Sequence, residues 1–183
     1  MNTVIKHLLI ISALLTFVYS IPSIAKGIYQ TPEQFIAGVF LDQAPEVKTL
    51  WLNKGDKLEI AKILNHSFNR MRIRYWHSKD SSAWVLEEIG KEQQITMGVH
   101  IKSPIDQIKK PRIVTLKILT YRESRGDEVR HDFYTNQFVD ATLRGDNDLS
   151  NHIDGITGAT LSVRATKKVA KLALWLTNKA NNK

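Results

Sequence analysis

The chain has 183 residues, of which 43% are hydrophobic, and a formal net charge of +8. A chain of this length can bury one sizeable hydrophobic core, so a single globular domain is predicted. The chain contains no cysteine, which excludes disulfides, thiolate-held iron–sulfur clusters and covalently attached haem; any electron transfer would need an organic cofactor.

The N-terminal segment has the layout of a secretory signal. Residues 1–25 contain the basic Lys6, then an apolar run, and end with the small residues Ser23 and Ala25. We expect cleavage after Ala25 and a periplasmic location, with no membrane association afterwards. An uncleaved membrane anchor is the alternative, because residues 8–25 approach the length that spans a bilayer. We do not expect nucleic acid as a partner, because the chain is expected to be exported and contains no known nucleic-acid-binding motif. The positive charge is interpreted mainly as a solvated surface.

Hydrophobic periodicity predicts the elements that follow. Thr31 as N-cap and Pro32 in the first turn predict a short helix over residues 32–41. A strand-like stretch then precedes a second expected helix over residues 53–65. From Met71 onward the period changes to two, which indicates strands in three segments: 71–76, 96–102 and 112–121. These strands predict an antiparallel sheet with one wet face.

The last element is the clearest helix. Apolar residues recur at steps of three and four and predict a packing stripe: Ala165, Val169, Leu172, Ala173 and Leu176. A second, basic stripe is interpreted as solvated: Arg164, Lys167, Lys168 and Lys171. The predicted fold class is α+β, a single domain in which an antiparallel sheet packs with helices and a long C-terminal helix follows a turn.

That turn, residues 154–160, has the sequence DGITGAT. The hydroxyl residues Thr157, Thr160 and Ser162 surround Gly158, and glycine with alanine lets another group approach the backbone closely. The start of the following helix would favour a phosphate at this place. The residues alone leave two interpretations open, a plain turn and a phosphate-binding site.

The full pattern D-x-x-[S/T]-G-A-T, followed by an apolar and a hydroxyl residue, resembles the flavinylation motif of the FMN-binding domain family. This family includes flavin-carrying components of the sodium-translocating NADH:quinone reductase and of the related ferredoxin-dependent complex. In the family a flavin transferase moves FMN from FAD onto the last threonine of the motif. The resemblance implies covalent FMN on Thr160, with Ser162 beside the phosphate. The remaining matches correspond to the family's residues for recognition by the transferase and for the shape of the turn: Asp154, Thr157, Gly158 and Ala159.

A second segment supports the resemblance. The loop from Glu123 to Gly126 is similar to a Glu-Thr-Pro-Gly-like loop of the family, with Arg125 in the place of the proline, and a Phe-containing stretch follows. Glu123 and Arg125 are therefore candidate cofactor contacts, whereas a purely structural interpretation makes them an ion pair or solvated. The resemblance covers about residues 84–177. The expected division of the chain is a signal (1–25), an extension (26–83) and an FMN-binding domain (84–183).

The resemblance implies an exported electron carrier rather than an enzyme with its own substrate. It would relay electrons between membrane or periplasmic partners, such as a cytochrome or a quinone-linked protein. One alternative is a flavin-dependent reductase of a small acceptor, with a cationic cluster of Arg122, Arg125 and Arg130. The other is a cofactor-free secreted binding module of the same fold. The histidine spacing predicts no metal site, and residues 146–154 lack the glycine and glutamate of a calcium loop. Trp84 is interpreted as a core residue, with a position in the part of the sheet that covers the cofactor as the alternative.

Overall fold

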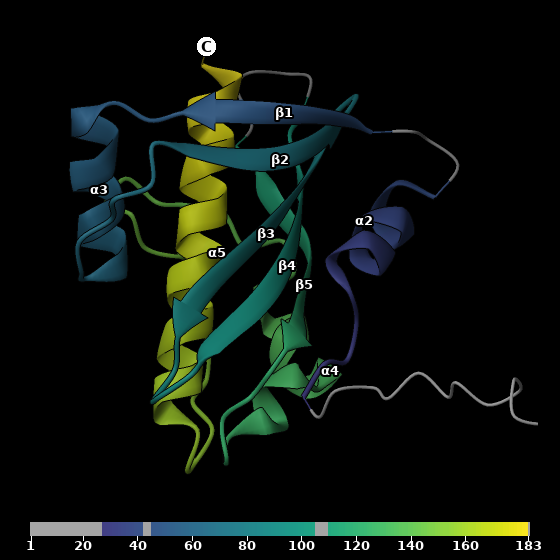
Figure 1. Cartoon of the computed structure of the whole chain (residues 1–183), viewed down its shortest axis with the longest axis vertical. Coiled ribbons are helices and arrows are strands. Elements are labelled where there is room, and N and C mark those ends of the chain that lie inside the picture. Colours follow the sequence, from purple (N-terminus) through teal and green to yellow (C-terminus); the bar gives the residue numbers. More distant parts are fainter. Residues whose placement is uncertain (1–26, 42–44, 105–109, 183) are drawn as a thin grey trace, which may run out of the picture.

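The main layer is an antiparallel sheet of five strands in the order β1-β2-β3-β4-β5 (Figure 1). The computed structural model describes residues 27–41, 45–104 and 110–182, so the expected signal, residues 1–25, lies outside the described residues. The strands are β1 (Glu46–Trp51), β2 (Arg72–Ser78), β3 (Ser81–Ile89), β4 (Gln94–Lys102) and β5 (Arg112–Thr120).

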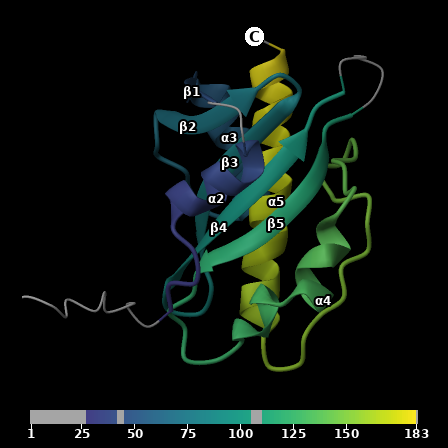
Figure 2. The ribbon, with the colours of Figure 1, turned by 90° about the vertical axis from the view of Figure 1, so that its right-hand side faces the viewer.

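The helix α5 (Thr160–Asn181) lies across one face of the sheet (Figures 1 and 2). The predicted apolar stripe of α5 is buried against the strands, which confirms the packing stripe and the α+β fold class. Trp84 is fully buried there: its Nε1 donates to Thr177 Oγ1 at 2.8 Å and its ring stacks on Tyr75 at 4.5 Å between centroids. Trp84 is therefore a core residue. No helix in the described part of the chain has the length and apolar character that a membrane crossing requires.

The helix α2 (Pro32–Phe40) covers part of the opposite face of the sheet. Phe35 packs directly on Gly98, where a Cβ atom would lie only 2.6 Å from the ring, and Ala83 and Leu119 complete this small cluster. The expectation of one wet face is therefore wrong over the centre of the sheet. Side chains of α2, a helix distant in the sequence from these strands, exclude water from this face, and the periodicity of the strands does not indicate their presence.

Two capping boxes begin the short helices at the expected places. Thr31 caps α2 with Gln34, and Asn53 caps α3 (Lys54–Leu64) with Asp56. Each cap satisfies backbone N–H groups that have no partner inside the helix. Lys179 of α5 lies 2.9 Å from the buried Asp56, which fixes α3 beside the end of the long helix.

Among the five strands of the described sheet, β3 is the strand that the periodicity did not predict. Trp84 and Leu86 are buried on the side of α5, whereas Ala83 and the half-buried Val85 lie on the side of α2. Because both faces are covered, the strand shows no alternation of apolar and polar residues. The expected boundary between residues 83 and 84 falls inside this strand, and the same sheet continues on both sides of it.

The three lysines of the basic stripe of α5 are paired, contrary to the expectation of a solvated face, whereas Arg164 is exposed as expected. Lys168 lies 3.1 Å from the buried Glu88, and Lys171 lies 2.7 Å from Asp148. Lys167 donates to the carbonyl of Ile153 at 3.0 Å. The carboxylates and the carbonyl come from segments distant along the chain, so the helix sequence alone gives no sign of these pairs.

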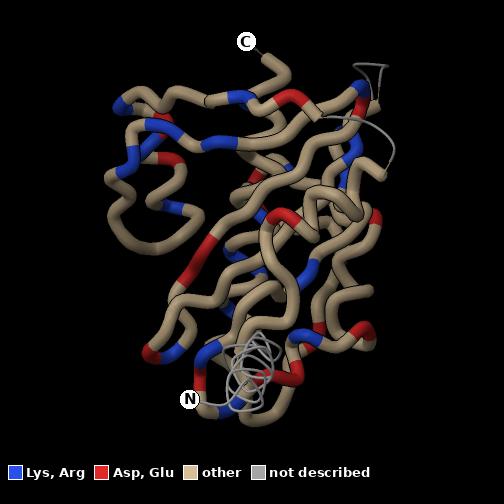
Figure 3. The backbone as a smooth tube through the Cα atoms, turned by 45° about the vertical axis from the view of Figure 1, so that its right-hand side comes forward, with Lys and Arg blue, Asp and Glu red and all other residues tan. Residues whose placement is uncertain are grey.

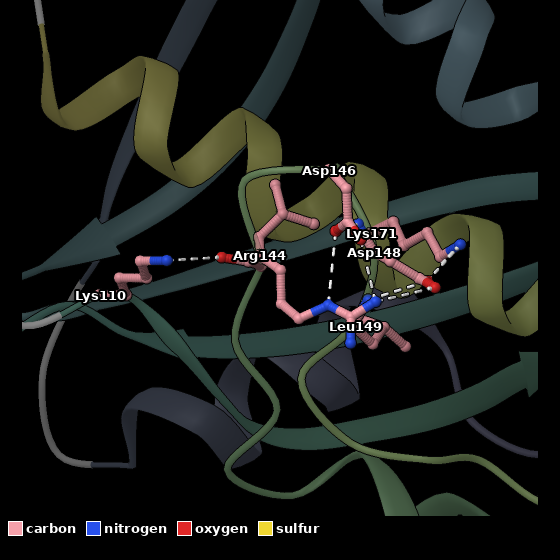
Figure 4. Close-up of polar contacts among 7 residues, drawn as sticks. Lys110, Arg144, Asp146, Asp148, Leu149 and Lys171 are labelled. Carbon is pink, nitrogen blue, oxygen red and sulfur yellow. Dashed lines mark hydrogen bonds and ion pairs between the residues drawn. The ribbon is translucent and has the colours of Figure 1, made fainter.

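The segment before the turn is held against α5 by a charge network (Figure 4). Arg144 pairs with Asp146 at 3.0 Å and with Asp148 at 3.6 Å, and Asp148 also pairs with Lys171. The aspartates of the calcium-like segment therefore bind cationic side chains. Among the described residues no group of three or more His, Cys, Asp or Glu side chains could hold a metal ion.

Candidate functional site

The turn leaves the start of α5 open. Ala159 occupies the N-cap position without a side-chain cap, and Thr160, the first helical residue, is exposed. The N–H of Val163 bonds to Ala159 O at 2.9 Å. The N–H groups of residues 160–162 have no acceptor within the helix by its geometry, so they point outward from its positive end. Gly158 has a φ of +84°, a left-handed conformation that glycine adopts easily.

Side chains from the preceding segment fix the outer part of the turn. The N–H of Asp154 donates to Gln137 Oε1 at 2.7 Å, and Asn151 Nδ2 donates to the Gln137 carbonyl at 3.1 Å. The Asp154 carboxylate is exposed and lies 3.3 Å from His152 Nε2. Thr157 is also exposed. Both motif residues therefore face outward, where another protein could contact them.

The loop after β5 is locked to the start of α5. Tyr121 Oη donates to the Arg125 carbonyl and lies 2.8 Å from Ser162 Oγ, and burial raises the pKa of Tyr121. Ser162 is only 4% exposed. Gly126 has a φ of +89°, and a Cβ atom there would lie 2.8 Å from Tyr121 Oη and 3.2 Å from Ala159 Cβ. Loop and helix start consequently form one packed unit.

Glu123 ties the β3–β4 turn to the same unit. Its Oε1 accepts the backbone N–H groups of Lys91, Glu92 and Gln93 at 2.5, 2.8 and 3.1 Å. Burial alone would raise the pKa of Glu123, but these donors and the charge of Lys91 outweigh burial and lower it. No ion pair between Glu123 and Arg125 is found among the described side chains. Glu123 thus stays ionised and shapes the turn.

These parts enclose a hollow of about 470 Å³, within the ordinary range of roughly 300–1,000 Å³ for small-molecule sites. One wall comes from residues 158–162 and the other from the two loops. Six of the eight candidate residues line it: Glu123, Arg125, Gly158, Ala159, Thr160 and Ser162. Asp154 and Thr157 do not.

Three further residues line the hollow that the motifs did not indicate: Lys91, Ser124 and Leu161. Lys91 lies in the β3–β4 turn and reaches the site only through the folding of the sheet. The resemblance to the family implies that the Phe-containing stretch after the loop packs near the cofactor, but this stretch supplies no lining side chain here: Phe133 is exposed and Phe138 is buried in the core.

The charges around the hollow suit a phosphodiester. Lys91 and Arg125 contribute two cations to the lining, although Lys91 also lies 3.3 Å from Glu92. The open N–H groups of α5 add the positive end of its dipole, and Glu123 is the single anion of the lining. Thr160, which is exposed, lies at the same helix start. The residues present therefore fit a phosphate group at this position.

Fold and site define an α+β domain with a ligand hollow over an open helix start. The model of the FMN-binding domain family matches residues 90–175, a span that contains β4, β5, the turn and most of α5. Residues 90–175 therefore form an FMN-binding domain, and FMN is the ligand that this match supports. Comparison with curated proteins and with solved structures gave no match.

The cationic cluster of the reductase alternative is not assembled in the hollow. Arg125 lines it, but the Arg130 guanidinium lies 4.7 Å from the Tyr29 ring centroid and 3.3 Å from Asp127. Arg122 is exposed outside the lining. The three arginines therefore do not converge on the hollow in the described part of the chain.

Proposed function

We propose that this protein is an exported electron-transfer flavoprotein that carries FMN covalently through a phosphoester to Thr160. The observation that carries the proposal is the position of Thr160. Thr160 is exposed at an uncapped helix start and lines a hollow together with other residues of the matched FMN-binding domain.

The attachment is a group transfer with a defined balance. The Thr160 oxygen forms a bond to the FMN phosphorus of FAD, the bond to the AMP phosphate breaks, and AMP leaves while the hydroxyl proton is lost. One negative charge remains on the resulting diester. The open N–H groups of α5, Lys91 and Arg125 are placed to stabilise that charge. A flavin transferase is the required partner.

Covalent attachment matches the proposed export to the periplasm. A cofactor held by contacts alone dissociates when its free concentration falls well below the dissociation constant, and a phosphoester removes that dependence. Attached FMN supplies the exchange of one or two electrons. The chain binds and orients it, and its redox partners are membrane or periplasmic proteins such as a cytochrome or a quinone-linked protein.

The test is flavin fluorescence of the denatured protein. Wild type and Thr160→Ala are each produced with a flavin transferase, exported, denatured and run on a gel under ultraviolet light. We expect a fluorescent band for wild type and none for Thr160→Ala. Ser124→Ala is the matched control, because Ser124 is another exposed hydroxyl of the same hollow; its band should persist.

The alternatives give different results. A band that survives Thr160→Ala places the bond elsewhere, and no band in any variant favours the cofactor-free binding module. Rapid turnover of a soluble small acceptor by the isolated reduced protein favours the reductase. Asp154→Ala should reduce labelling, since the exposed Asp154 belongs to the motif that the transferase recognises in the family.

A further inference from the structure

The outer face of β2 carries a row of cationic and aromatic side chains. Ile73 and Tyr75 of this strand are buried towards α5, whereas Arg72 and Arg74 are exposed on the opposite face and Trp76 is half-buried. This face borders the cover of α2: Trp76 packs against the apolar cluster of that helix, and Pro32 of α2 lines the same surface. Basic segments gather on the strands near the upper end of Figure 3, where Figure 1 places β1 and β2.

The neighbouring strand extends the same surface. Trp51 of β1 is opposite Arg72 and Thr49 is opposite Arg74 in the sheet register. Trp51 is 57% exposed and Val47 is 59% exposed. The Arg72 guanidinium lies 5.7 Å from the Trp51 ring centroid. Such contact orders the guanidinium and lowers the entropy that a ligand must overcome.

This surface forms an open groove of about 710 Å³, lined among others by Thr49, Arg70, Arg72, Arg74, Trp76 and Glu87. Three arginines face one carboxylate, and Glu87 already lies 3.4 Å from Arg70. Arg74 makes no hydrogen bond or ion pair with the described part of the chain. The groove therefore has an uncompensated positive charge.

We propose that this groove docks an acidic segment of a partner protein. The forked guanidinium group of arginine binds carboxylates through two parallel hydrogen bonds. Trp and Arg are also enriched among the residues that contribute most of the binding energy in protein interfaces. Arg72 and Arg74 occupy alternate positions of a strand, about 6.6 Å apart, which matches alternate side chains of an extended acidic peptide.

The part of the groove formed by Arg74 and Trp76 lies far from the proposed flavin attachment. Tyr75 of β2 stacks on Trp84, which bonds to Thr177. Thr177 follows Thr160 by 177 − 160 = 17 residues, or about 25 Å along α5. A partner held at Arg74 and Trp76 would therefore leave the hollow at Thr160 uncovered.

The test measures fluorescence anisotropy of a labelled octaglutamate peptide with the full chain at low salt. We expect saturable binding, and Arg72→Gln with Arg74→Gln should raise Kd about tenfold. The matched control, Lys117→Gln with Arg164→Gln, removes the same charge from two other exposed positions and should raise Kd less than twofold. Arg72→Lys with Arg74→Lys keeps the charge without the fork and should fall between the two.

Other outcomes overturn the proposal. Absence of saturable peptide binding does so, as does an equal loss in the two charge-matched pairs, which would mean unspecific attraction to a basic protein. Tighter binding of phosphatidylglycerol vesicles or of an oligothymidylate, lost with the same two arginines, would assign the groove to lipid or nucleic acid instead. Equal thermal midpoints of all variants exclude unfolding as the cause.

Discussion

Replacement of Gly126 by alanine tests how tightly the loop after β5 is packed on the start of α5. Gly126 has a φ of +89°, and the added methyl group would lie 2.8 Å from Tyr121 Oη and 3.1 Å from Ser162 Oγ. The first of these distances is shorter than any ordinary contact. Alanine must therefore adopt an unfavourable backbone conformation and also push Tyr121 away from Ser162.

The cost follows from two independent contributions. The left-handed conformation costs a non-glycine residue about 1–2 kcal/mol. Loss of the buried hydrogen bond between Tyr121 and Ser162 adds about 1 kcal/mol. We expect Gly126→Ala to lower the free energy of unfolding by about 2–3 kcal/mol, which for a chain of this size lowers the melting temperature by roughly 5–10 °C.

Urea unfolding followed by circular dichroism measures this, with two matched glycines as controls. Gly158 has a φ of +84° but no atom within 4 Å of an added Cβ, so Gly158→Ala should cost only the conformational part. Gly145 has neither feature, and its replacement should stay within about 0.5 kcal/mol of wild type. If Gly126→Ala costs no more than Gly158→Ala, the packing of loop on helix is wrong.

Two further predictions concern titratable groups. The hydrogen bond to Glu88 raises the pKa of His66, so the pair stabilises the fold below the unfolded pKa of about 6.5 and loses this contribution as pH rises through the folded pKa. Because His66 is 46% exposed, the contribution is at most about 1 kcal/mol; the difference in melting temperature between wild type and His66→Gln should be larger at pH 5.5 than at pH 8.5, and a constant difference would contradict the pairing. Glu123→Ala removes the acceptor of three backbone N–H groups and should cost about 1–2 kcal/mol at neutral pH. The pKa of Glu123 is lowered in the folded protein, so this loss of stability should shrink as acid protonates Glu123 in the wild type. Thermal unfolding of wild type and Glu123→Ala at pH 7 and pH 3 measures the loss, and an equal loss at both pH values would contradict the role of the Glu123 carboxylate in holding the β3–β4 turn.

Local signals in the sequence predicted the elements whose cause is local. Thr31 and Asn53 begin helices because their own side chains cap nearby N–H groups. The apolar stripe of α5 was predictable because one face alone meets the sheet. Strand β3 was not, because Trp84 and Val85 point to two different covered faces and leave no period to detect.

The candidate site was predictable only in part. The motif placed Gly158, Ala159 and Thr160 at the helix start, and the structure brings them to a hollow. Lys91 reaches that hollow from another turn, and Glu123 bonds to the backbone of that turn. Such contacts depend on how strands pair, which no short window of the sequence specifies.

The most direct test of the central claim is mass spectrometry of the peptide that contains Thr160, from cells that export the protein and contain a flavin transferase. The account predicts a peptide heavier by FMN less one water, with the modification localised to Thr160. An unmodified peptide, together with a functional transferase shown by labelling of another substrate, would contradict it.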